Sequence, residues 1–408
     1  MRTMFRSLSV RNFRLYAVGG FISNIGTWMQ STAMAWLVLE VDGGGVGLGA
    51  AIALQMAPTL VLSLWAGALA DRIPKRRIIV MSQLVMAVFS ATLGLLAVLS
   101  AVWLWQILLL NLLFGIGRAL ETPARLSFVS EIVGHEQLGN AVSLNSASFH
   151  ASRLIGPGVA GIVIAALGSG ASATGWVILV NAVSYGASIT ALFSLDMALL
   201  NPAPDQTRQR RGAVVEAFRY LRTRSDLQLV VIVSFFIGMF GMNFTILSAL
   251  MASQEFGKAA EEFGILGVLM AIGSLVGPLL TARRPNPSLS LLVGAAVLYA
   301  CIQLVAALTP SFLAYALTVP FTGLTVYTFA TAANATIQLR TDPIVRGRIT
   351  SLYTMALLGA VPLGAPVFGF IGQHLGPRSA LVVSAVGCLI GVAVGCVAFW
   401  RRRGLTSR

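Results

Sequence analysis

The sequence predicts an all-α membrane protein with twelve transmembrane helices, arranged as two pseudo-symmetric six-helix bundles with N- and C-termini in the cytoplasm. Three observations support this fold class. Hydrophobic residues make up 57% of the 408 residues and charged residues only 10%, which is far from the composition of a soluble domain. Apolar runs long enough to cross a bilayer core of about 30 Å recur along the whole chain. Inside lipid the backbone must satisfy its hydrogen bonds within each segment, and this requirement indicates helices.

The first apolar run follows a basic start, as in a signal peptide, but it exceeds the roughly 7–15 residues of a signal core. We therefore expect it to be retained as the first helix. The hydropathy pattern places the twelve helices near 13–39, 46–70, 77–100, 103–124, 138–166, 172–195, 227–252, 261–282, 288–308, 311–338, 348–373 and 378–400.

The longest polar interruption, 196–226, carries two prolines and six arginines and divides the chain nearly in half. Such a segment is typical of a boundary between domains. We therefore expect an N-terminal six-helix bundle at 1–195, a cytoplasmic basic linker at 196–226 and a C-terminal six-helix bundle at 227–408. A shift of 208 residues aligns Gly156 with Gly364 and Gly161 with Gly369, as related halves would.

The positive charge fixes the expected orientation. The net charge is +14, and the basic residues lie in short segments between apolar runs, so they indicate membrane orientation rather than nucleic-acid binding. If both termini are cytoplasmic, the basic residues fall on that side, except for Lys258 and Arg378 outside and Arg153 within a helix. Because lysine and arginine are retained on the cytoplasmic side, this asymmetry predicts cytoplasmic termini.

A charged hinge at 67–77 joins the second and third predicted helices. Its sequence, GALADRIPKRR, resembles the hinge signature of the major facilitator superfamily. The matching positions are Gly67, Leu69, Asp71, Arg72 and Arg76, whereas Pro74 and Lys75 replace the usual glycine and arginine. The resemblance implies a cytoplasmic latch in which Asp71 contacts the start of the eleventh helix, and Gly67 allows close helix packing. The alternative is that the basic residues only orient the loop.

The fifth predicted helix contains Gly156, Pro157 and Gly161 in the sequence GPGVAG. This stretch is similar to a signature of exporters in the superfamily, with Ala160 replacing one glycine. Proline removes a backbone donor and bends a helix, and glycines allow close packing. The alternative interpretation is a kinked, closely packed helix without a transport role.

Three charged residues are candidates for an ion pair or for proton coupling: Arg118, Glu121 and Arg153. A buried arginine near mid-membrane costs at least ~2.5 kcal/mol unless it faces a partner, water or a cavity. Glu121 is the candidate partner of Arg153, with helix-four carbonyls as the alternative. The fourth helix resembles an antiporter pattern, but Asn111 stands where that pattern has arginine. Arg118 or Arg153 could substitute for it, and Glu121 could accept a proton if burial disfavours its charged form.

Further polar side chains within the predicted helices could line a central cavity. Each could equally form a hydrogen bond between helices. These candidates are Asn24, Trp28, Gln30, Gln55, Asn145, Asn243, Gln303, Asn334 and Gln338.

The most specific resemblance is to one branch of the superfamily, which contains enterobactin exporters, macrolide-efflux proteins and transmembrane secretion effectors. It rests on short stretches in both the first and the fourth to fifth helices: FRLY at 13–16, GTWMQ at 26–30, PAR at 123–125, LGNA at 138–141 and LNS at 144–146. The resemblance implies a proton-driven exporter of a siderophore or drug-like molecule, working as a monomer in the bacterial inner membrane.

Two other classes stay open: an uptake symporter of the same fold, and a membrane sensor or assembly protein that transports nothing. We expect no enzyme, cofactor, metal or nucleic-acid partner. The chain has no nucleotide-binding glycine-rich loop, and its three histidines are scattered singly. The expected partners are the lipid bilayer, a small-molecule substrate and protons.

Overall fold

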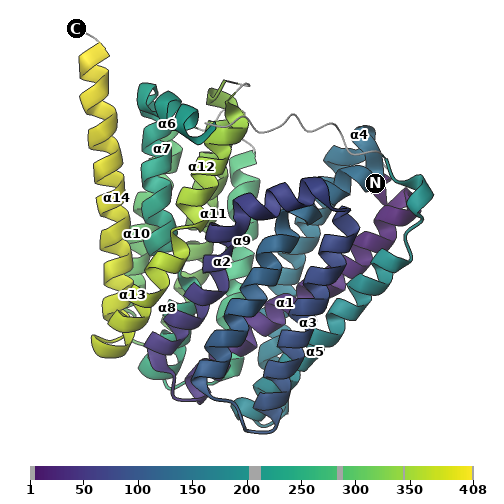
Figure 1. Ribbon diagram of the computed structural model, residues 1–408. Helices are drawn as coiled ribbons and strands as arrows, with labels where there is room; N and C mark the ends of the chain where they lie inside the picture. Colours follow the sequence, from purple (N-terminus) through teal and green to yellow (C-terminus); the bar gives the residue numbers. More distant parts are fainter. Residues whose placement is uncertain (1–4, 202–212, 283–287, 343–344, 407–408) are drawn as a thin grey trace. The chain divides into compact units, whose positions relative to one another are not determined.

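The computed structural model describes residues 5–201, 213–282, 288–342 and 345–406, and they form helices joined by short connections (Figure 1). They group into two compact units. Unit 1 contains 1–47, 54–207 and 259–268, and unit 2 contains 48–53, 208–258 and 269–408.

The helices of the first half begin and end close to the predicted positions. They are η1 (Arg6–Ser9), α1 (Arg11–Glu40), α2 (Gly44–Arg72), α3 (Lys75–Val98), α4 (Leu104–Ala166), α5 (Gly170–Phe193) and η2 (Met197–Leu199). In unit 1, α1 and α3 both pack against α4 and α5 (Figure 1). Small residues make this packing close, because a side chain on Gly26 would collide with Ser184, and one on Gly19 would lie 2.7 Å from the Ala191 Cβ.

Helix α4 differs from the prediction of two helices joined by a loop. It runs through both expected segments and is interrupted only at Gly134, where φ is 67° and ψ is 178°. Glycine has no Cβ and adopts such a left-handed φ without strain, so the chain turns there without a loop. Residues 125–134 are helical, so Arg125 lies on a helix rather than in the connection predicted between 124 and 138.

Eleven helical segments in the described part of the chain are long and apolar enough to cross a membrane. Helix α1 is not among them, although it is 30 residues long. Its middle carries Asn24, Thr27 and Gln30, which lower its hydropathy. Polar residues at this depth of a membrane helix are costly unless they face other protein or water.

Unit 2 contains the remaining helices. They are α6 (Ala213–Thr223), α7 (Ser225–Phe236), η3 (Ile237–Gly241), α8 (Phe244–Leu250), η4 (Met251–Glu255), α9 (Ala260–Ala282), α10 (Leu289–Ala307), α11 (Phe312–Arg340), α12 (Arg346–Leu358), α13 (Val361–His374) and α14 (Pro377–Thr406). The start of α9 groups with unit 1. Part of the expected linker, 196–226, is thus helical, and its residues 202–212 lie outside the described part.

Two predicted continuous helices of unit 2 are interrupted. The segment predicted at 348–373 breaks at 359–360, and α13 restarts with Pro362 in its first turn, where proline's missing N–H is not needed. The segment predicted at 227–252 passes through a π-helical stretch, η3, and unwinds at 242–243. Hydropathy alone could not predict either break.

Side chains cap the three carbonyls that end η3. Asn243 Nδ2 donates to Met239 O at 2.8 Å, Ser384 Oγ to Phe240 O at 2.6 Å, and the Tyr299 hydroxyl to Gly241 O at 3.0 Å. Gln303 Nε2 in turn donates to the Tyr299 hydroxyl at 2.6 Å. Interrupted helices in membranes are tolerated where neighbouring side chains satisfy the backbone in this way.

Replacing Tyr299 by phenylalanine is expected to destabilise the protein by about 1–3 kcal/mol, because Tyr299 is fully buried and its loss leaves Gly241 O and Gln303 without their partner. Thermal unfolding of the purified chain in detergent measures this change. Tyr315→Phe is the matched control, since Tyr315 is also buried and its hydroxyl has no hydrogen bond within the described residues. Equal stability of the two variants would contradict the capping role.

Candidate functional site

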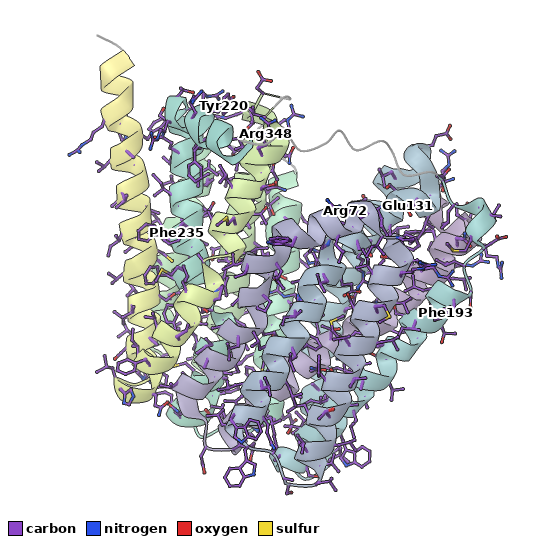
Figure 2. The ribbon with its side chains drawn as sticks, viewed as in Figure 1. Arg72, Glu131, Phe193, Tyr220, Phe235 and Arg348 are labelled. Atoms are coloured by element: carbon purple, nitrogen blue, oxygen red, sulfur yellow. The ribbon has the colours of Figure 1, made fainter. Side chains whose placement is uncertain are left out.

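The hinge between α2 and α3 makes its described side-chain contacts with α4 and α5 of the same unit. Lys75 Nζ lies 2.5 Å from Glu131 Oε1 on α4, and the Arg76 guanidinium lies 5.1 Å from the centre of the Phe193 ring on α5. Arg72 is exposed at the same end of the unit as Glu131 (Figure 2). No described atom lies within 4 Å of a Cβ placed on Gly67, and the close packing predicted there stays a prediction. The side chain of Asp71 lies outside the described part, and the latch stays a prediction.

The GPGVAG motif lies in the second half of α4 and brings that helix against α1. A Cβ on Gly156 would lie 2.5 Å from the Trp28 Cβ. Pro157 and Gly161 follow on α4, both buried. A larger residue than glycine at 156 would therefore push Trp28 and α4 apart.

Around the same Trp28, five side chains of unit 1 form what we call the aromatic–cation face. Its members are Asn24 and Trp28 on α1, and Asn145, Phe149 and Arg153 on α4. They recur every four residues on each helix, so each set lies on one helical face. The rings of Trp28 and Phe149 meet edge to face with centroids 5.6 Å apart, and the Arg153 guanidinium lies 5.2 Å from the Trp28 ring centre.

The aromatic–cation face is partly exposed within unit 1. Arginine and asparagine in the middle of membrane helices rarely face lipid, because the desolvation cost is too high. This face therefore fits a water-accessible surface rather than a lipid contact. It offers aromatic area and one positive charge, a combination suited to an amphipathic or anionic small molecule.

A second group of unit 1 is buried and charged. Glu121 on α4 is 7% exposed, and its Oε1 accepts a hydrogen bond of 2.8 Å from Gln83 Nε2 on α3. Arg125, one turn further along α4, places Nη1 3.6 Å from the same oxygen. The Arg125 guanidinium lies against α1, where a Cβ on Gly20 would be 2.9 Å from Nη2. Glu121 is the one buried acid within the described residues.

Two acceptors lie beside Glu121. The buried Gln83 Oε1 has no hydrogen-bond partner within the described residues, and the Tyr16 hydroxyl on α1 interacts with Arg125. A carboxylate only accepts hydrogen bonds, whereas a protonated carboxyl also donates one. We call the group of Gln83, Glu121, Arg125 and Tyr16 the Glu121 network. It contains oxygens that could accept a hydrogen bond from the protonated carboxyl of Glu121.

The other predicted cavity residues divide between two kinds of environment. Some are buried and bonded inside their own unit: Gln30 to Asn181 at 2.5 Å, Gln55 to Asn111 at 3.4 Å, and Asn243 and Gln303 at the break of η3. Asn334 and Gln338 are exposed on α11, and Gln338 donates to the Thr350 hydroxyl at 3.3 Å. Gln30 and Gln55 thus make contacts between helices, whereas Asn243 and Gln303 bond to residues one turn away in their own segments.

The predicted ion pair of Glu121 with Arg153 stays a prediction, because the partners described for Glu121 are Gln83 and Arg125. Arg118 lies half-buried on α4. Sequence reasoning missed Gln83, Arg125 and Phe149. The spacing of four residues from Glu121 to Arg125, and from Asn145 to Phe149 and Arg153, could have indicated two of them, because such residues are neighbours on a helix.

Comparison with known sequences identifies the class of protein. The family described as transmembrane secretion effector matches residues 2–402. The chain therefore belongs to this family of major facilitator superfamily transporters, and the predicted resemblance is confirmed. The relatives and structural neighbours are transporters rather than enzymes.

Three characterised relatives have similar sequences. The staphyloferrin A transporter of Staphylococcus aureus is 26% identical over 64% of this chain and 65% of its own length. The multidrug efflux pump Tap of Mycolicibacterium fortuitum is 26% identical over 94% of this chain and 95% of the pump. The enterobactin exporter EntS of Citrobacter koseri is 23% identical over 93% of this chain and 89% of the exporter.

The fold is also similar to that of solved transporters. The crystal structure of a bacterial homologue of the human lysosomal transporter Spinster superimposes with a TM-score of 0.74. It is 16% identical and covers 95% of this chain and 97% of that one. At this identity the likeness concerns the fold alone.

Proposed function

We propose that this protein is a proton-driven exporter of a small amphipathic molecule, siderophore or drug-like, in the bacterial inner membrane. The aromatic–cation face is the observation that carries the proposal. Trp28 and Phe149 offer ring surface to an apolar or aromatic group, and Arg153 offers a positive charge to an anionic one. The names of the staphyloferrin A transporter, the efflux pump Tap and the enterobactin exporter support a siderophore or drug substrate.

In the proposed topology twelve helices cross the membrane and both termini are cytoplasmic. The halves 1–195 and 227–408 move against each other around a site near mid-membrane, as in alternating access. The latch residues Gly67, Asp71, Arg72 and Arg76 would stabilise one of the two access states. The ion pair of Lys75 with α4 and the cation–π contact of Arg76 with α5 support this role, because they fix the hinge to one half.

The Glu121 network is the proposed site of proton exchange. In the ionised state the Glu121 carboxylate accepts from Gln83 and attracts Arg125. When it takes a proton, the ion pair is lost, and the new O–H can donate to Gln83 Oε1 after the amide turns over. Arg125, which interacts with the Tyr16 hydroxyl as well as with the acid, keeps that neighbour when the acid is neutral. The network thus has hydrogen bonds for both protonation states, which buried polar groups require.

Transport by everted membrane vesicles tests the proposed function. Vesicles containing the protein are expected to accumulate enterobactin, staphyloferrin A or a fluorescent dye when their interior is made acidic, and to release it when the gradient is collapsed. Vesicles without the protein are the control. If none of these compounds moves in response to the gradient, the exporter proposal is wrong. Accumulation in right-side-out vesicles instead would indicate uptake.

A further inference from the structure

One end of unit 2 carries a polar hollow that is separate from the Glu121 network and the aromatic–cation face. Its volume is about 570 Å³. Its lining comes from the first turn of α7, the start of α10, the end of α11 and the last part of α14. The lining residues are Arg224, Ser225, Asp226, Ser288, Leu289, Ser290, Arg340 and Phe399. Tyr220 and Arg348 lie at this end of the unit (Figure 2).

The hollow lies where the helices leave the membrane. Each lining residue is at or near the end of a helix predicted to span the bilayer. Trp400 follows Phe399 on α14 and is 67% exposed, and Leu339 precedes Arg340 and is 60% exposed. Exposed tryptophan at a helix end is typical of the interface between hydrocarbon and headgroups. A ligand in this hollow would therefore be at the depth of lipid headgroups.

The two arginines of the hollow differ in how they are held. Arg224 donates from Nε and Nη2 to Asp226 at 3.1 and 2.9 Å, and from Nη1 to the Tyr220 hydroxyl at 3.2 Å. Among the described residues Arg340 makes only an ion pair with Asp226, at 3.7 Å, and its side chain is 41% exposed. Within the described residues its guanidinium donates no hydrogen bond. Asp226 thus positions both guanidinium groups while leaving the Arg340 donors available.

The rest of the lining also favours an anion. Ser288 caps α10 by accepting from Leu291 N at 3.2 Å, and its hydroxyl lies 2.7 Å from that of Ser290. The start of a helix carries a partial positive charge and unpaired N–H groups. The formal charge of Arg224, Arg340 and Asp226 together is +1, which matches the single negative charge of a phosphodiester.

We propose that this hollow binds the phosphate of an anionic phospholipid, with Arg340 as its principal ligand and the start of α10 as a second. A free phosphate ion offers the same chemistry, but the position among exposed apolar residues favours a lipid, whose acyl chains can extend along the helices. Basic pockets between membrane helices bind anionic headgroups in this way. In the proposed topology the lipid belongs to the cytoplasmic leaflet.

Native mass spectrometry of the purified full-length chain, titrated with phosphatidylglycerol or phosphatidylcholine, tests the site. We expect tighter binding of phosphatidylglycerol, and Arg340→Gln should weaken it at least about tenfold, because it removes a direct charge-assisted hydrogen bond to the phosphate. Arg340→Lys keeps the positive charge but loses the planar guanidinium with its several N–H donors, and should give an intermediate affinity. Arg77→Gln is the matched control, an exposed arginine of unit 1 outside the hollow, and should leave the affinity within about twofold of the wild type.

Three outcomes would overturn the proposal: equal binding of the two lipids, equal effects of Arg340→Gln and Arg77→Gln, or displacement of phosphatidylglycerol by millimolar inorganic phosphate. The last result would indicate a site for the free ion. The measurement involves no transport. A protein that exports nothing could still bind the lipid here, so failure of the proposed function and failure of this site are distinguishable.

Discussion

Glu121→Gln is expected to abolish the coupling of transport to the proton gradient while substrate exchange continues. Glutamine has nearly the same shape and can keep a hydrogen bond with Gln83, but it cannot release or take up a proton. A gradient of one pH unit supplies about 1.4 kcal/mol per proton exchanged, enough for a roughly tenfold accumulation of substrate. In proteoliposomes the wild type should approach this ratio, and the variant should only equilibrate substrate across the membrane.

Two further variants show whether the effect belongs to this acid. Glu136 lies exposed on the same helix, so Glu136→Gln changes the charge equally outside the network and should accumulate substrate normally. Glu121→Asp keeps a titratable group and should retain part of the accumulation. If Glu121→Gln still concentrates substrate, Glu121 does not couple protons. Counterflow of labelled substrate without a gradient confirms that the variant is folded.

Arg153→Gln is expected to raise the KM for an anionic substrate about tenfold with a smaller effect on maximal rate. The variant removes the one positive charge of the aromatic–cation face and its contact with Trp28. A cation–π contact contributes about 0.5–2 kcal/mol, and attraction of an anion adds to the effect on substrate binding. Substrate-dependent initial rates of transport measure KM and maximal rate separately.

Variants of Trp28 help to separate an effect on substrate binding from an effect on folding. Trp28→Leu should raise KM as well, whereas Trp28→Phe keeps a ring and should have a milder effect. Trp65 on α2 is 76% exposed and lies outside the site, so Trp65→Leu is the matched control. An unchanged KM in Arg153→Gln, or a lower one, would contradict the assignment of an anionic substrate to this face.

The sequence was sufficient to predict the helical membrane fold and the family, because both depend on long apolar runs and on local motifs. Helix ends were harder to predict where polar residues lie within a helix. The fourth helix is predicted to end near 124, which leaves Arg125 in the connection, yet α4 continues to Gly134. Burial of Arg125 beside α1 makes its charge compatible with the helix, and such burial is a tertiary property that composition does not contain.

The roles of single polar residues were not predictable for a similar reason. Gln30 and Asn24 lie on the same helix, but Gln30 points to Asn181 and is buried, whereas Asn24 belongs to the partly exposed aromatic–cation face. The rotation of α1 relative to its neighbours decides which residue is buried against another helix and which is exposed. The periodicity of one helix does not determine that rotation, so the sequence could only give the two alternatives.

Proton movement caused by substrate tests the central proposal most directly. The purified protein is placed in liposomes that contain a pH indicator, and enterobactin or another transported compound is added outside without a pH gradient. An exporter that exchanges protons for substrate predicts a change of internal pH that follows substrate entry and is absent in Glu121→Gln. Substrate entry without any change of internal pH, or an equal change in Glu121→Gln, would contradict it.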